Sequence, residues 1–188
     1  MSKLLVVVDM QNDFIDGPLG TKEAQAIVDP IYHFIAQFIK NKSYDEYGIP
    51  IDKIIFTKDT HYEDTIEKIS YLDSQEGKNL PVPHCIYQSR GWYICDKLGD
   101  FAINHGYTIL KETFGSTFLG EICTNKKFDE IHFVGVCTDI CVISNALLVK
   151  AFDPEAKIIV HKDLCAGVTP ESHEIALKAM QACQIEIV

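Results

Sequence analysis

The sequence lacks the long apolar runs that cross membranes. Its first apolar run, Leu4 to Val8, ends at Asp9, whereas a membrane span needs about 20 consecutive apolar residues. The run is also too short for the apolar core of a secretory signal peptide. We therefore expect a cytoplasmic protein with no membrane partner.

Positive charge is also scarce. The 17 lysine and arginine residues face 27 aspartate and glutamate residues, for a net charge of -10. An excess of negative charge repels nucleic-acid phosphates and anionic lipids. The charge therefore argues against nucleic acid as a partner, although it does not select a substrate.

No two of the seven cysteines form a Cys-x-x-Cys pair. That absence removes the usual signal of a thiol redox motif or a cysteine-rich zinc site. In a reducing compartment we expect most of these cysteines to be free thiols. A free cysteine is by default a small core residue, so any other role needs its own evidence.

Apolar runs alternate with helical patterns along the whole chain. The 188 residues show no repeat, low-complexity segment or linker, so we predict a single domain over residues 1–188. The pattern predicts an α/β fold, a three-layer α/β/α sandwich with a six-stranded, mostly parallel sheet. The predicted strands are 4–8, 53–57, 107–111, 131–135, 157–161 and 185–188. The predicted helices are 22–40, 92–105, 117–124, 144–152 and 170–183.

Two segments have a weaker pattern. Pro30 falls inside the first predicted helix and should bend or split it. Residues 74–90 contain one glycine and two prolines, which predicts an irregular segment.

Four reactive side chains follow predicted strands. Asp9, Asp59, Lys111 and Cys141 each come at or just after a strand end, where ligands bind in parallel α/β sheets. A single strand-terminal aspartate is usually a cap, and a single lysine is usually solvated. Four such residues at one rim favour a functional site.

Cys141 lies between an apolar strand and an alanine- and leucine-rich helix. Unpaired N–H groups and the helix dipole at a helix start favour the thiolate. The position alone leaves two interpretations open, a nucleophile or a buried structural cysteine.

Three segments together resemble a known superfamily. Residues 7–14 (VVDMQNDF), Lys111 before 115–118 (GSTF), and 135–142 (GVCTDICV) are similar to the three signatures of the isochorismatase-like cysteine hydrolases. Within it the chain is most similar to the nicotinamidases, because residues 58–61 (KDTH) and 83–85 (PHC) resemble their metal-binding segments. The resemblance covers nearly the whole chain.

The resemblance implies one divalent metal ion held by Asp59, His61 and His84. Two histidines and a carboxylate suit zinc, iron or manganese, and zinc is the favoured ion. Asp59 and His61 lie two residues apart, so an extended segment can direct both side chains at one point.

The resemblance also implies a mechanism. Nicotinamide and water would give nicotinate and ammonia through a thioester on Cys141, with Lys111 lowering the thiol pKa and Asp9 transferring protons. The backbone amides of Cys137 and Cys141 would form the oxyanion hole, after a non-proline cis peptide at Val136–Cys137. Phe14 would pack on the substrate ring, while the metal holds the ring nitrogen.

Some roles stay open. Asp13 either orients Lys111 or caps a turn, and Cys137 is either a small packing residue or the partner of Cys141 in a regulatory disulfide. Residues 80–82 (LPV) stand where many nicotinamidases carry a ring-stacking tryptophan, for which Trp92 or Tyr71 could substitute.

Three other functions compete with a nicotinamidase. The same machinery could act on another small-molecule amide. The chain could be an isochorismatase-type vinyl ether hydrolase, or a silent binding scaffold. The intact metal set argues against the vinyl ether hydrolase, and the intact Asp9, Lys111 and Cys141 argue against the scaffold. Relatives commonly form dimers or larger assemblies, so a homo-oligomer is also an expectation.

Overall fold

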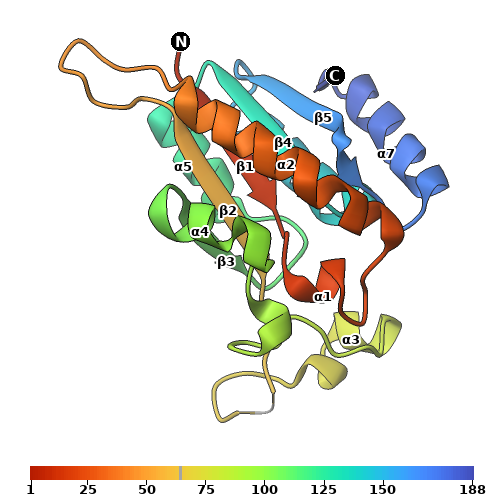
Figure 1. The fold of residues 1–188 in the computed structure, drawn as a ribbon. Coiled ribbons are helices and arrows are strands. Elements are labelled where there is room, and N and C mark those ends of the chain that lie inside the picture. The colour runs from red at the N-terminus through yellow and green to blue at the C-terminus, as the bar shows by residue number, and fades with distance from the viewer. Residues whose placement is uncertain (64) are drawn as a thin grey trace.

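The computed structural model describes residues 1–63 and 65–188. Six strands form one sheet in the order β3-β2-β1-β4-β5-β6, and every neighbouring pair is parallel (Figure 1). The strands are β1 (Lys3–Val8), β2 (Lys53–Asp59), β3 (Tyr107–Lys111), β4 (Glu130–Val136), β5 (Lys157–Ala166) and β6 (Glu186–Ile187). The predicted α/β class is confirmed.

Helices cover both faces of the sheet. One face packs against α2 (Lys22–Lys40) and α4 (Asp96–Asn104). The other packs against α5 (Thr117–Lys126), α6 (Ile143–Phe152) and α7 (Pro170–Ala182). The short elements are α1 (Asn12–Ile15), η1 (Tyr71–Asp73), α3 (Gln75–Asn79), η2 (Arg90–Trp92) and η3 (Thr138–Val142). Within the described ranges, no helix is long and apolar enough to span a bilayer.

The β1 sequence explains the three layers. Successive side chains of a strand point to opposite faces. Leu4 and Val6 lie in the core beneath α5, α6 and α7, while Leu5 and Val7 lie in the core beneath α2. A strand buried on both faces needs an unbroken apolar run, which is why this segment does not alternate with polar residues.

Two segments differ from the helix prediction by more than two residues. The helix predicted from Trp92 begins at Asp96, because Ile94 pairs with Gln11 and the Cys95 N–H donates to the Met10 carbonyl. The segment predicted to be irregular contains α3, where the Ser74 hydroxyl accepts the Gly77 N–H at 2.9 Å.

Of the two effects predicted for Pro30, a bend or a split of the helix, the split is absent. Helix α2 runs as one element from Lys22 to Lys40. Pro30 and Ala26 are both exposed, so water can hydrate the Ala26 carbonyl that loses its helical donor. An exposed proline therefore does not have to end this helix.

Strand order places the switch point of the sheet between β1 and β4. From β1 the chain adds β2 and then β3 on one side, and β4 then pairs with the other side of β1. Crevices form at such points, outside the carboxyl ends of the strands. The loops after β1 and β4, which carry Asp9 and Cys141, therefore border the same crevice.

Gly135 allows β4 to lie against β1. It has φ +117, and a Cβ atom there would lie 2.1 Å from the Val8 carbonyl oxygen. Alanine would clash with backbone that cannot move without breaking the β1–β4 pairing. We expect Gly135→Ala to lower the free energy of unfolding by about 2–4 kcal/mol, measured by urea denaturation.

Gly99→Ala is the matched control. Gly99 lies within α4, and a Cβ atom there would meet no side chain or other element of the described chain within 4 Å. Alanine there should raise stability by up to about 1 kcal/mol through helix propensity. Equal effects of the two substitutions would contradict the packing role of Gly135.

Candidate active site

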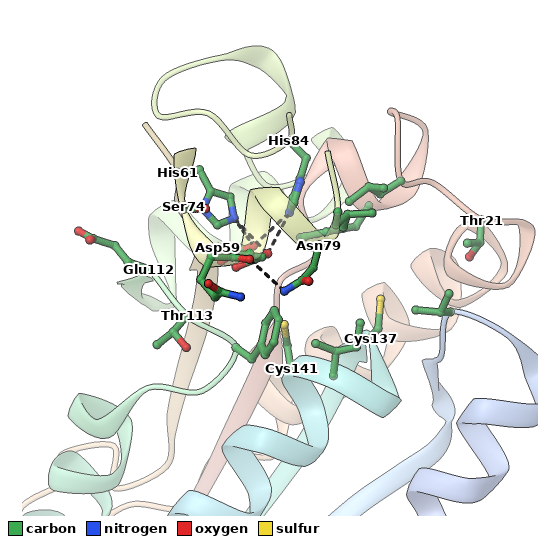
Figure 2. A pocket seen from close by; sticks show the side chains of 18 residues that line it. Thr21, Asp59, His61, Ser74, Asn79, His84, Glu112, Thr113, Cys137 and Cys141 are labelled. Atoms are coloured by element: carbon green, nitrogen blue, oxygen red, sulfur yellow. Dashed lines mark hydrogen bonds and ion pairs between the residues drawn. The ribbon is translucent and has the colours of Figure 1, made fainter. Parts of the chain in front are cut away.

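The carboxyl ends of four adjacent strands carry the candidate site. Asp9 follows β1, Asp59 ends β2, Lys111 ends β3, and Cys141 lies in η3 after β4. Figure 2 shows Asp59 and Cys141 facing one pocket from different elements. The predicted convergence of these four residues on one rim is confirmed.

Lys111 contacts the other three residues. Its Nζ lies 2.7 Å from Asp9 Oδ2, 3.3 Å from Asp59 Oδ1 and 3.5 Å from Cys141 Sγ. The lysine side chain is only 1% exposed. A buried ammonium must be paired with negative charge, so Lys111 holds both carboxylates and the sulfur at fixed positions.

The two carboxylate oxygens of Asp9 have different partners, Lys111 and Thr57. The Thr57 hydroxyl donates to Asp9 Oδ1 at 2.7 Å. Oδ2 forms the ion pair with Lys111, and no described residue other than Lys111 donates to it. Because Thr57 occupies Oδ1, Oδ2 is the oxygen with capacity to take a proton.

The electrostatics differ from the expectation of a readily ionised thiol. Burial raises the pKa of Cys141 well above its usual value; Lys111 opposes this, while Asp9 and Asp59 add to it. Lys111 acts in the predicted direction, but the loss of solvent outweighs it. The thiol is therefore protonated at rest, and it would need a base to act as a nucleophile.

Asp9 has the properties of that base. Burial raises its pKa; Lys111 lowers it, and Asp59 raises it further. Burial alone would lower the pKa of Lys111, but Asp9, Cys141 and Asp59 together raise it well above its usual value. Lys111 therefore stays positively charged, while the carboxylate of Asp9 beside it binds a proton more readily than an ordinary aspartate.

A second cluster shares Asp59 with the first. One donor atom from each of Asp59, His61, Glu76 and His84 lies within 4.8 Å of the other three. Asp59 Oδ2 is 3.1 Å from His61 Nε2 and 3.6 Å from His84 Nε2. Glu76 Oε1 is 3.6 Å from His61 Nε2 and 3.8 Å from His84 Nε2. Figure 2 shows both histidine rings turned toward Asp59.

These separations fit a metal ion. Four ligands about 2.1 Å from a tetrahedral zinc ion lie about 3.4 Å from one another, close to the distances above. Burial and Asp59 also raise the pKa of Glu76, as expected of two carboxylates brought close together. The donor set therefore fits a divalent metal.

Hydrogen bonds hold the donors in place. His84 Nδ1 lies 2.8 Å from the Val82 carbonyl, which leaves Nε2 free for a metal. The Gln11 side chain binds both the N–H and the carbonyl of Asp59, at 2.7 and 2.8 Å. Asp13 accepts the Cys85 N–H at 2.7 Å, and it thereby fixes the loop that carries His84. Of its two proposed roles, the structure supports capping.

Glu76 was not predicted from the sequence. It lies in α3, inside the segment predicted to be irregular. The local signal is Ser74 at the helix start and Gly77 packed against the Tyr71 carbonyl, where a Cβ atom would lie 2.0 Å from the oxygen. A serine cap two residues before a glutamate does not by itself indicate a metal ligand.

The turn that carries Cys141 has an unusual backbone. The Val136–Cys137 peptide is cis, which confirms the prediction. The Val142 N–H then donates to the Cys137 carbonyl at 3.0 Å, as the π-helical turn η3 begins. The Thr138 hydroxyl lies 2.8 Å from His173 Nδ1 of α7, so a second helix supports the turn.

Asn145 joins this turn to the loop after β3. Its side-chain NH₂ donates to the Cys141 carbonyl at 2.8 Å and to the Phe114 carbonyl at 3.1 Å, and its oxygen accepts the Ser116 N–H at 3.0 Å. The residue is fully buried. The Asn145 side chain therefore fixes the turn that carries Cys141 relative to the pocket wall at Phe114.

The pocket has a volume of about 770 Å³. Phe14 lines it, with its ring centroid 5.5 Å from that of His84. The other lining aromatic is Phe114, which the sequence did not indicate. Trp92 is buried beneath Lys58 and donates to the Thr60 hydroxyl, and it lies outside the lining.

Tyr71 and Cys137 contribute in other ways. Tyr71 lies 4.6 Å from His61 and 5.0 Å from His84 between ring centroids, so it packs behind the metal set instead of lining the pocket. Cys137 lines the pocket as a free thiol. Burial raises the pKa of Cys137 to about 12, so it is neutral.

Comparison with known proteins shows what the chain is similar to. The isochorismatase domain model matches residues 3–188. An uncharacterized isochorismatase family protein, PncA of Bacillus subtilis, is 30% identical over 94% of this chain and 93% of its own length. The crystal structure of nicotinamidase/pyrazinamidase PncA from Bacillus subtilis matches with a TM-score of 0.80 at 26% identity, over 100% of both chains. Pyrazinamidase of Pyrococcus horikoshii in complex with zinc matches with a TM-score of 0.74 at 26% identity, over 99% of this chain and 98% of that one.

Removal of the Asn145 side-chain amide should loosen the site. Asn145→Ala removes the partner of three backbone groups, two of them in buried hydrogen bonds, and we expect a loss of about 2–4 kcal/mol in the free energy of unfolding. Urea denaturation measures it. Ser144→Ala is the control, because Ser144 is half-buried and donates only to the Ile140 carbonyl. A similar small loss in both variants would contradict the role of Asn145.

Removal of the Glu76 charge should weaken metal binding. We expect Glu76→Gln to raise the zinc Kd about 10- to 100-fold, measured by competition with a chromogenic chelator. Glu174→Gln removes the same charge from an exposed position on α7 and should leave the Kd unchanged. Equal affinities of the two variants would show that Glu76 does not contribute.

Proposed function

We propose a reaction for this chain from one premise: the chain belongs to the isochorismatase family. It is a hydrolase that acts on amide C–N bonds. The proposed reaction is nicotinamide and water to nicotinate and ammonia. The names of the similar solved structures support that substrate, and so does a metal-ligand set beside a cysteine.

One observation carries the proposal. Lys111 Nζ contacts Asp9 and Cys141 and, at 3.3 Å, also Asp59 of the metal-ligand set. The residues that would cleave the amide and those that would hold the ring therefore share one buried cation. A substrate needs both a reactive carboxamide and a metal-binding atom a short distance away, and a pyridine carboxamide has both.

Acylation follows from the two oxygens of Asp9. The Cys141 thiol gives its proton to Asp9 Oδ2, and the sulfur bonds to the carboxamide carbon. Lys111 stabilises the thiolate as it forms. The backbone N–H groups of Cys137 and Cys141 are proposed to hold the oxyanion. The C–N bond then breaks, and the nitrogen leaves as ammonia with the proton from Asp9.

Deacylation uses the same groups in reverse. Asp9 takes a proton from water, and the water oxygen attacks the thioester carbon. The C–S bond breaks, the proton returns to sulfur, and the acid product leaves. Thr57 keeps Asp9 Oδ1 occupied at 2.7 Å, so the same oxygen serves both half-reactions.

Asp59, His61, Glu76 and His84 would hold the metal, and zinc is the proposed ion. When bound, the metal supplies positive charge and a coordination position for the ring nitrogen, which orients the carboxamide toward Cys141. Phe14 is proposed to pack on the ring from the side of His84.

A second candidate is a cysteine amidase of the same machinery with a different small amide. The pocket volume favours it, since about 770 Å³ exceeds what one small ring fills. An isochorismatase-type vinyl ether hydrolase is disfavoured, because it does not require the four-donor cluster.

Substitution of Cys141 should abolish ammonia release. We expect Cys141→Ala, with zinc bound, to release ammonia from nicotinamide at least about 10⁴-fold more slowly than the unaltered protein. Cys183→Ala is the control, because Cys183 is an exposed free thiol. Retained activity in Cys141→Ala would exclude the thioester. No release by the unaltered, zinc-loaded protein would exclude nicotinamide as the substrate.

A further inference from the structure

The pocket is larger than the proposed substrate requires. Its volume is about 770 Å³, in the range of roughly 300–1,000 Å³ that buries drug-sized ligands. Nicotinamide is one six-membered ring with one carboxamide and fills only a part of it. The position of the remaining volume shows which part of a larger substrate it would hold.

The extra volume is not on the leaving-group side of Cys141. There the interior is filled by Asp9 and Lys111, which are 0% and 4% exposed and do not line the pocket. The carboxamide nitrogen must lie near Asp9 to receive its proton, so no space remains for a large group on that nitrogen. The free volume therefore lies around the ring.

The lining of the pocket extends past Cys137 to Thr21, and we call this end of the pocket the arm. Figure 2 shows Thr21 on the opposite side of Cys137 from Asp59, His61 and His84. We define the arm by its four lining residues, Leu19, Thr21, Ile140 and Val168. They come from the loop before α2, from η3 and from the loop after β5.

The arm is apolar. Leu19 and Ile140 are half-buried, and Val168 is 49% exposed. The hydroxyl oxygen of Thr21 accepts the Ala24 N–H at 3.0 Å as the cap of α2, and the three other residues of the arm have apolar side chains. The acidic lining residues are at the other end of the pocket, where Figure 2 places Asp59 and Glu112.

We infer that this site takes single-ring carboxamides that carry a short apolar substituent on the ring. The inference rests on the proposed amidase function and names its substrate class more narrowly. With the carboxamide at Cys141 and the ring nitrogen at the metal set, the ring edge that faces away from the metal set extends into the arm. A substituent there covers Leu19, Ile140 and Val168, which the unsubstituted ring leaves in contact with water.

Alkyl chain length tests the inference. The zinc-loaded full chain is assayed for ammonia release from nicotinamide and its 5-methyl, 5-ethyl and 5-propyl derivatives. Position 5 is meta to both the carboxamide and the ring nitrogen. We expect kcat/KM to rise about fourfold for each added carbon, and a 5-hydroxymethyl group to give no gain over 5-methyl.

A variant that fills the arm provides the control. In Val168→Trp the ratio of kcat/KM for the 5-propyl compound to that for nicotinamide should fall at least tenfold. Ile175→Trp adds the same side chain at a 61% exposed position on α7 and should keep the ratio of the unaltered protein. If Val168→Trp fails to fold, Leu19→Trp takes its place.

The outcomes separate the two proposals. Turnover of nicotinamide with no gain from alkyl groups overturns the arm inference and leaves the proposed function intact. No turnover of any compound overturns the proposed function. In that case the arm inference is tested by binding, measured as the rise in Tm on addition of each compound. If 5-propylnicotinamide raises the Tm no more than nicotinamide does, the arm inference is overturned.

Discussion

The buried ammonium of Lys111 is the charge on which the site depends. It lies out of solvent at the end of β3, so its burial is tolerable only beside negative charge. Asp9 and Asp59 provide that charge from the two neighbouring strands, at 2.7 and 3.3 Å. Although burial alone would raise the pKa of Asp59, Lys111 and the hydrogen bonds from His61 and His84 hold it well below its usual range. The carboxylate therefore stays ionised where a metal would need it, while Asp9 stays protonatable.

The sequence predicted the features that depend on short apolar patterns and on where a residue lies relative to the end of a strand. The apolar run of β1 required burial on both faces, and Asp9, Asp59 and Lys111 had to share a rim once the sheet was parallel. Glu76 could not be predicted, because it reaches the metal set only through a short helix held by Ser74 and Gly77. Asn145 could not be predicted either, since two of its three partners lie about 30 residues away in sequence. The protonation state of the Cys141 thiol depends on two opposing effects, burial, which raises its pKa, and Lys111, which lowers it. The position of Cys141 at a helix start does not predict which effect is larger.

Strands and loops divide the work of the site. The groups proposed to break the bond come from the ends of hydrogen-bonded strands and from η3, where the backbone is fixed. The apolar pocket walls Leu19, Phe114 and Val168 come from connecting segments. Loops tolerate more change than the sheet does. The same bond-breaking residues can therefore serve different ring amides when only the walls change.

The hydrogen bonds of Asn145 have a consequence for how such change is tolerated. All three bind backbone groups, of Cys141, Phe114 and Ser116. Backbone groups are present whichever amino acid occupies a position. Phe114 can therefore be replaced in evolution by a smaller or more polar side chain, and Asn145 would still hold this loop against the turn that carries Cys141. Asn145 would in this way allow related proteins to accept new substrates while the position of Cys141 stays the same.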